Sequence, residues 1–196
     1  MMTTNKRTGV TAVPAHSRGT SMLEILITIL ILTVGMLGLA ALQGKAFTSE
    51  LESYQRGQAL ILLQDIYSSM EGNMSKAADY VTSSDGLGTG VNDVICCGCV
   101  YKVPHPTRAE IDLCEWSKAL KGTAEAQGGA NQGAMINGRG CVATTATANV
   151  YLISVVWQGL NATAAPATEC GKTLYDSEAT RRAVTMTFRV PDLAGS

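Results

Sequence analysis

The stretch Met22–Leu42, MLEILITILILTVGMLGLAAL, decides the fold of this chain of 196 residues. It holds one charged residue, Glu24, and the 18 residues from Ile25 to Leu42 contain neither a charge nor a proline. About 18 apolar residues suffice to cross a membrane as a helix. A carboxylate in such a segment is costly in lipid and usually has a specific partner, so Glu24 is the first candidate functional residue.

The charges on either side of this segment indicate its orientation. Basic residues without acidic ones precede it, at Lys6, Arg7 and Arg18, whereas both signs follow it, at Lys45, Glu50 and Glu52. Because basic flanks stay in the cytoplasm, we expect the N-terminus there and everything after Lys45 beyond the membrane. An ordinary secretory signal is the alternative: no clear small-residue cleavage site follows Leu42, but Ala40 and Ala41 keep it open.

The residues around Glu24 match a known type of leader. The string Ser17-Arg18-Gly19-Thr20-Ser21-Met22-Leu23-Glu24, followed by Ile25-Leu26-Ile27, resembles the class III signal sequence of type IV pilins and pseudopilins. The resemblance implies that a prepilin peptidase cuts between Gly19 and Thr20, that Thr20 becomes the N-methylated terminus, and that Glu24 serves subunit assembly. Thr20 departs from the phenylalanine usual in the family. The implied organisation is a leader (1–19), a transmembrane half-helix (20–43) and an exported globular domain (44–196).

The helix is expected to continue beyond the membrane. Apolar residues recur at spacings of three and four, at Phe47, Leu51, Tyr54, Ala59, Leu62, Ile66 and Met70, and no proline occurs between Pro14 and Pro104. This predicts one helix from about Thr20 to about Ser75. The apolar run Leu60–Leu63 predicts burial on several sides, against a sheet. A membrane anchor followed by a separate amphipathic helix is the alternative.

A second helix and two strands follow. Thr107-Arg108-Ala109-Glu110 has the form of a capping box, and Gly122 ends the helix that it begins, with Trp116 as a packing anchor. The stretch 122–140, with six glycines, is expected to be mobile or solvent-facing. Residues 150–157 and 183–190 have strand patterns. The predicted fold class is α+β, and the resemblance implies the type IV pilin arrangement, a long N-terminal helix packed on a C-terminal antiparallel β-sheet.

All cysteines lie beyond the apolar segment, at Cys96, Cys97, Cys99, Cys114, Cys141 and Cys170. An even number in an exported domain predicts disulfide bonds, and six cysteines allow 15 arrangements. We prefer a bond between Cys141 and Cys170, because both flank the strand at 150–157 and would tie its ends to the sheet. Cys96 and Cys99 have C-x-x-C spacing, but neither a redox nor a zinc context surrounds them.

The order of the C-terminal elements adds a narrower resemblance. The matching segments are Asp112-Leu113-Cys114-Glu115-Trp116, Gly138-Arg139-Gly140-Cys141, Val155-Val156-Trp157-Gln158-Gly159, Cys170 and Arg181-Arg182-Ala183-Val184. In this order they resemble the minor pilins of the PilV type, or type IV pilus modification proteins. Arg181-Arg182 is expected to be a solvated strand end, with contact to a partner subunit as the alternative.

The resemblance implies a minor pilin that takes part in pilus assembly or initiation and is displayed at the pilus tip or surface. Its implied partners are other major and minor pilins, the prepilin peptidase and the pilus assembly machinery of the inner membrane. The new amine of Thr20 would pair with Glu24 of a neighbouring subunit, which relieves the cost of burying both charges and sets the register. The implied location is the bacterial inner membrane, as a single-pass protein, before assembly and the pilus afterwards.

Other function classes are less favoured. Removal of residues 1–19 leaves 12 basic and 16 acidic side chains, a net charge of −4, and no basic patch with interleaved aromatic residues suggests nucleic-acid binding. After removal of residues 1–19, a membrane-anchored enzyme would have His105 as the single histidine available to activate a nucleophile. We predict no enzymatic activity, no cofactor and no metal site. A minor pseudopilin of a type II secretion system shares the leader, helix and sheet and stays the main alternative.

In cells that lack the prepilin peptidase we expect the full-length chain to accumulate, because Gly19 and the basic leader form the cleavage signal. Where the peptidase is present, mass spectrometry of the intact protein should place the mature N-terminus at Thr20. A mature N-terminus beyond Leu42 would mean an ordinary signal peptide and would contradict the resemblance.

Overall fold

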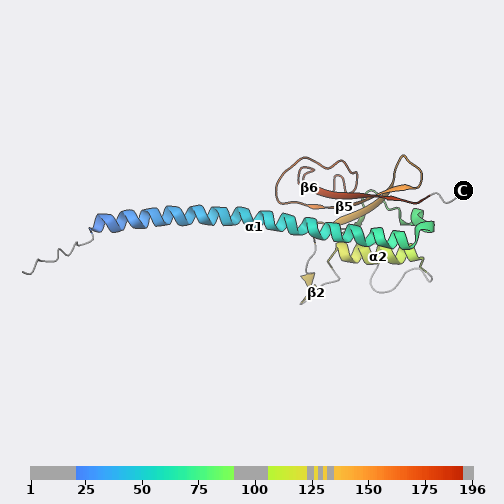
Figure 1. Ribbon diagram of the computed structural model, residues 1–196, viewed down its shortest axis with the longest axis horizontal. Helices are drawn as coiled ribbons and strands as arrows, with labels where there is room; N and C mark the ends of the chain where they lie inside the picture. Colours follow the sequence, from blue (N-terminus) through green and yellow to red (C-terminus); the bar gives the residue numbers. More distant parts are fainter. Residues whose placement is uncertain (1–20, 91–105, 123–125, 128–129, 132–134, 192–196) are drawn as a thin grey trace, which may run out of the picture. The chain divides into compact units, whose positions relative to one another are not determined.

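The computed structural model describes residues 21–90, 106–122, 126–127, 130–131 and 135–191. The chain divides into two compact units, Met1–Lys45 and Ala46–Ser196. The first unit contains the beginning of helix α1 (Met22–Gly72), and the second contains the rest of α1 and the other elements (Figure 1). The fold is α+β, with a long apolar N-terminal helix and a C-terminal antiparallel sheet of four strands.

Helix α1 continues for 51 residues without interruption, as the absence of proline predicts. A 3₁₀ helix, η1 (Met74–Tyr80), follows it. Within the second unit α1 buries one stripe of side chains, which consists of Gln55, Ala59, Leu63, Ile66 and Met70. Leu60 and Ile61 are 42% and 59% exposed. The prediction that Leu60–Leu63 is buried on several sides is therefore wrong, because the core covers only the Leu63 side of this helix.

The main sheet contains β1 (Leu87–Gly88), β4 (Arg139–Thr144), β5 (Val150–Gln158) and β6 (Arg181–Arg189), in the order β1-β4-β5-β6. The expected strands at 150–157 and 183–190 correspond to β5 and β6. Strand β4, however, begins within the stretch 122–140 that we expected to be mobile or solvent-facing. Two further short strands, β2 (Ala126–Gln127) and β3 (Ala130–Asn131), pair with each other in the same stretch.

The main hydrophobic core lies on one face of this sheet. Because side chains alternate along a strand, Tyr151, Ile153, Val155 and Trp157 of β5 all join the core that the stripe of α1 enters. Strand β6 adds Val184 and Phe188, with Met186 and Val190 partly buried, as their alternation predicts. Tyr67 of α1 meets Phe188 edge to face, with ring centroids 5.2 Å apart. Each large side chain buried here contributes about 1.5 to 3 kcal/mol to folding.

Helix α2 (Arg108–Leu120) begins with the predicted capping box. Glu110 donates its backbone N–H to Thr107 Oγ1 (3.3 Å), and Thr107 donates its own N–H to Glu110 Oε2 (2.7 Å). Trp116 is 1% exposed, and its Nε1–H donates to the carbonyl oxygen of Leu62 in α1 (2.8 Å). The prediction that Trp116 is a packing anchor is confirmed, and the indole joins the two helices that Figure 1 shows side by side.

A buried hydrogen bond attaches α2 to η1. The Tyr80 hydroxyl donates to Asp112 Oδ2 (2.5 Å), and Asp112 also pairs with Arg108 (2.9 Å). Burial, together with the hydrogen bond to Asp112, raises the pKa of Tyr80 to about 12. The phenol therefore keeps its proton, and the contact remains intact, at neutral pH.

Gly140 of β4 lies so close to the Trp116 ring that an added Cβ would overlap it. Gly140→Ala should destabilise the fold by about 1 to 3 kcal/mol, because a strand backbone and a buried indole cannot easily move apart. Gly57→Ala is the matched control, since a Cβ there meets no atom within 4 Å and alanine favours a helix by about 1 kcal/mol. Thermal unfolding of the full chain in detergent micelles should show a lower Tm for the first variant only. Equal Tm values for the two variants would contradict this packing.

Candidate functional site

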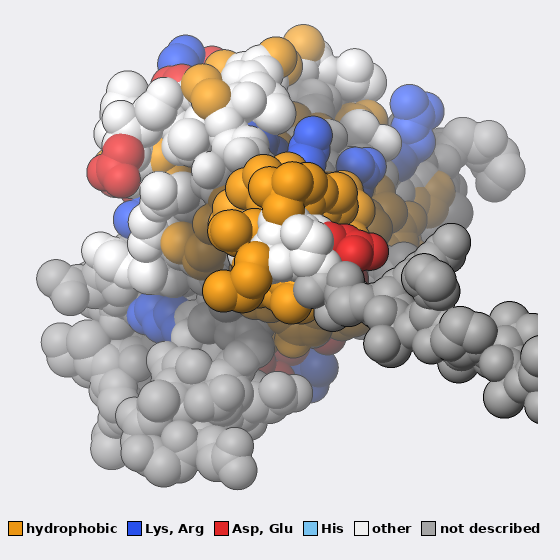
Figure 2. All heavy atoms as spheres, turned by 90° about the vertical axis from the view of Figure 1, so that its left-hand side faces the viewer, with side chains coloured by type: hydrophobic (Ala, Val, Ile, Leu, Met, Phe, Trp, Pro, Cys, Tyr) orange, Lys and Arg blue, Asp and Glu red, His pale blue; other side chains and the backbone are white. Residues whose placement is uncertain are grey.

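Glu24 lies in the first turn of α1, where its backbone N–H donates to the carbonyl oxygen of Ser21 (2.9 Å). The large apolar side chains from Met22 to Leu42 are each at least 46% exposed. Figure 2, a view onto the N-terminal end of α1, shows hydrophobic side chains around most of the circumference of the helix, with an acidic side chain on one side. A helix that is apolar on every face requires lipid or protein around it.

By length and composition α1 is able to cross a membrane. Its most apolar 18-residue window has a mean hydropathy of 2.7, and the described residues bury none of that window. No other helix in the described part of the chain meets the same criterion. This finding is compatible with the expected membrane anchor. The cleavage site Gly19–Thr20 lies outside the described residues, and the roles of Gly19, Thr20 and Glu24 stay predictions.

Cys141 of β4 and Cys170 form a disulfide bond with their Cα atoms 5.8 Å apart, so the preferred pairing is confirmed. Cys114 in α2 is also disulfide-bonded. Cys96, Cys97 and Cys99 lie outside the described residues, as does His105. The bond between Cys141 and Cys170 fastens the β5–β6 loop, residues 159–180, to the central part of the sheet.

This loop covers part of the sheet face opposite to the helices. Cys141, Val156, Cys170 and Tyr175 form a second, smaller core there. The Tyr175 hydroxyl donates to the carbonyl oxygen of Asn137 (2.9 Å), and burial raises the pKa of this phenol. In contrast to these anchors, residues 160–165 are exposed without interruption. The loop therefore has two parts. Residues 166–178, which include the anchors Cys170 and Tyr175, form its base, and the exposed residues 160–165 form its tip.

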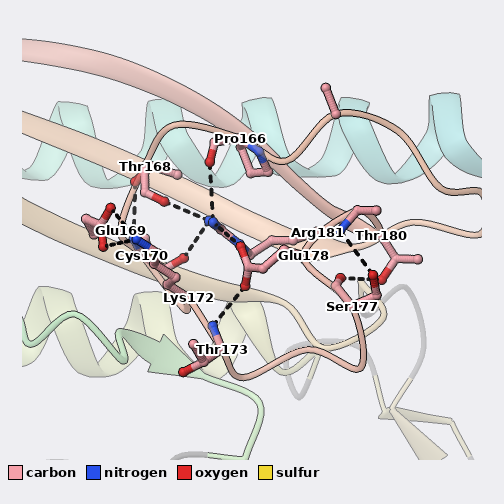
Figure 3. Close-up of polar contacts among 12 residues, drawn as sticks. Pro166, Thr168, Glu169, Cys170, Lys172, Thr173, Ser177, Glu178, Thr180 and Arg181 are labelled. Atoms are coloured by element: carbon pink, nitrogen blue, oxygen red, sulfur yellow. Dashed lines mark hydrogen bonds and ion pairs between the residues drawn. The ribbon is translucent and has the colours of Figure 1, made fainter.

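Arg181 holds the base of the loop in place (Figure 3). Its side chain is 1% exposed, and its Nε and Nη2 both donate to Glu178 Oε2. The remaining hydrogen bonds of the guanidinium go to backbone carbonyl oxygens of the loop, at Pro166 (3.3 Å), Thr168 (2.8 Å) and Cys170 (3.1 Å). Because the planar guanidinium offers five donors, one side chain satisfies carbonyls that have no strand partner.

Arg182 points to the other face of the sheet. It donates to the carbonyl oxygens of Ala179 and Asn161, and lies 3.5 Å from Glu52 Oε1 of α1. Glu52 in turn accepts hydrogen bonds from the backbone N–H and the side chain of Asn161. Arg182 and Glu52 therefore tie the exposed tip of the loop to α1.

The interpretation of Arg181-Arg182 as a solvated strand end is wrong. The alternation of side chains along β6 sends these two arginines to opposite faces, and each face carries a layer that supplies hydrogen-bond acceptors. A sequence signal did exist, since Glu178 precedes Arg181 by three residues. The loop carbonyls that bind Arg181 carry no such signal, because any residue has one.

The described residues contain no group of three or more His, Cys, Asp or Glu side chains that could hold a metal ion. Comparison of the chain with protein-family models, curated proteins and solved structures found no match.

The Glu178–Arg181 contact predicts a pH dependence. The hydrogen bond from Arg181, followed by that from the Thr173 N–H, lowers the pKa of Glu178 from its usual value of 4.5. A lowered pKa in the folded state means that this stabilisation is complete above about pH 4.5 and is lost as the pH falls through the folded-state pKa. The Tm difference between wild type and Glu178→Gln should therefore be largest at pH 7 and narrow toward pH 3.

Glu169→Gln is the control for this prediction. Glu169 pairs with Lys172, and both side chains are more than half exposed, so its loss should change stability by less than about 0.5 kcal/mol. A Tm difference for Glu178→Gln that stays constant between pH 7 and pH 3 would show that the carboxylate charge has no role in holding the loop.

Proposed function

We propose that this chain is a minor pilin of a type IV pilus, which takes part in pilus assembly or initiation and displays its globular unit at the pilus tip or surface. The observation that carries the proposal is Glu24, a carboxylate in the first turn of a helix whose other side chains as far as Leu42 are apolar or uncharged and exposed. The leader motif that ends at Gly19 supports the same proposal.

The electrostatics of Glu24 explain why a filament subunit would carry it. A simple membrane anchor gains nothing from a carboxylate in its apolar segment, because a charged residue in a membrane helix opposes insertion, by up to about 2.5 to 3.5 kcal/mol at the bilayer centre. In the proposed assembly the amine of processed Thr20 neutralises Glu24 of a neighbouring subunit. The pair forms only when the two helices are in register, so the same contact that removes the cost also selects the arrangement.

The second unit has the properties that a displayed subunit requires. Its β5–β6 loop is fixed to the sheet by the Cys141–Cys170 bond and by Arg181, whereas residues 160–165 remain accessible. A disulfide bond of this kind typically contributes about 2 to 4 kcal/mol and persists outside the cytoplasm. The proposed surface for contacts of the pilus is therefore the tip of a loop with a rigid base.

Glu24→Ala tests the proposal directly. The variant should insert into the membrane as well as wild type, and its leader should still be removed. Its amount in sheared pili, or co-purified with other pilins, should fall at least about tenfold, because the partner amine is left unpaired in a medium of low dielectric constant. Glu24→Asp should retain part of the interaction.

Glu50→Ala is the matched control, since Glu50 is an exposed carboxylate of the same helix outside the apolar segment. It should reach pili in normal amounts. If Glu24→Ala assembles as well as Glu50→Ala, the electrostatic mechanism is wrong, whatever the class of the protein.

A minor pseudopilin of a type II secretion system is the second candidate, because the leader and the apolar helix fit it equally. Deletion of the gene distinguishes the two functions. Loss of pili and of twitching motility would support the assignment as a minor pilin. Normal pili, with secreted enzymes retained in the periplasm, would instead support the assignment as a pseudopilin.

A further inference from the structure

A cavity of about 280 Å³ opens within the second unit between α1 and the β5–β6 pair. Its polar and aromatic wall consists of Ser49, Glu52, Ser53, Arg56, Trp157 and Arg182. The volume is close to the lower limit of ligand pockets, and it suits one small acid or one side chain of a peptide.

The charges of the wall favour an anion with a single negative charge. Two arginines and one glutamate line the cavity, so its net charge is positive by one unit. Arg182 is already bound to Glu52 and to two loop carbonyls. Arg56, in contrast, is exposed and forms no ion pair with any residue that the structure describes. Glu52 in the same wall would repel a doubly charged anion such as sulfate more strongly than a carboxylate.

Trp157, another residue of the wall, has a buried indole N–H. Trp157 lies opposite Arg182 across the β5–β6 ladder and is 3% exposed, yet its Nε1–H has no acceptor within the described part of the chain. Trp116, the other tryptophan, donates the equivalent N–H to Leu62. Buried N–H groups without an acceptor are rare, because the loss of water at such a group is not compensated.

We propose that this cavity binds a carboxylate group, with the Arg56 guanidinium as its counter-charge and the Trp157 Nε1–H as a hydrogen-bond donor. A carboxylate has two oxygens and is able to accept from both groups at once. Ser49 and Ser53 of α1 also line the cavity, and their hydroxyls are further possible donors to the carboxylate. The carboxylate belongs to a free organic acid or to a glutamate or aspartate of a peptide, and the inference holds whether or not the chain assembles into a filament.

The two indole N–H groups provide the measurement and its internal control. The full chain, labelled with ¹⁵N-tryptophan and held in detergent micelles, is titrated with sodium propionate and with a capped pentapeptide that contains one glutamate. The Trp157 indole signal should shift in a saturable manner, whereas the Trp116 signal should not move. Trp157→Phe assigns the two signals, and Trp116→Phe does so if the first variant does not fold.

Uncharged analogues and charge variants complete the test. Propionamide and the corresponding glutamine peptide should cause no saturable shift. Arg56→Gln should raise the Kd at least about fivefold, as expected for loss of a charge-assisted hydrogen bond. Arg189→Gln, which removes an exposed charge at the other end of β6, should leave the Kd within about twofold of wild type.

The two probes also identify the source of the carboxylate. Equal affinity for both supports a free organic acid as the ligand, whereas binding of the peptide at least tenfold more tightly supports a protein segment. The proposal would be overturned if the Trp157 indole signal showed no saturable shift with propionate or the glutamate peptide. An equal shift with propionamide and the glutamine peptide would overturn it as well. An unchanged Kd in Arg56→Gln would overturn the assignment of Arg56.

Discussion

The structure depends on a change in the surface of α1 along its length. From Met22 to Leu42 the helix is apolar on all faces apart from Glu24, and its large apolar side chains are exposed in the described part of the chain. From Gln55 to Met70 it buries only one stripe, at spacings of three and four residues, in the core of the second unit. The first part thus requires an apolar environment, while the second part supplies one side of a folded unit. A single continuous helix meets both requirements because no proline interrupts it.

Two kinds of interaction hold the second unit together on the two faces of its sheet. The helix face is held by close packing of apolar side chains. At Gly140 the Trp116 ring is so close to the backbone that no room is left for a Cβ atom. The opposite face has few large apolar side chains, and there a disulfide bond and one buried guanidinium hold the β5–β6 loop against the sheet. This division explains why we expect the loop base to depend on the charge of Glu178 and the helix face to depend on side-chain volume.

The sequence predicted those elements whose signals are local. The capping box at Thr107, the alternation along β6 and the long α1 are each defined by neighbouring residues, and the structure agrees with them. Strand β4 escaped prediction because Arg139-Gly140 opens it and a glycine-rich stretch precedes it. Its strand conformation depends on pairing with β5 and on the space that Gly140 leaves for Trp116. The roles of Arg181 and Arg182 were missed for a similar reason, since their acceptors are mostly backbone carbonyls from other parts of the chain.

The adjacent arginines of β6 have one further consequence. Because strand neighbours point to opposite faces, Arg181 binds the base of the β5–β6 loop and Arg182 binds its tip and α1. Two separate segments of the loop are thereby tied to a single dipeptide, and both guanidinium groups already have acceptors within the chain. Arg56 differs from both. It is an exposed residue of α1 that lines the same cavity as Glu52, and it forms no ion pair with any described residue. The positive charge that remains for recognition is therefore on the helix, beside a tryptophan whose N–H also lacks an acceptor there.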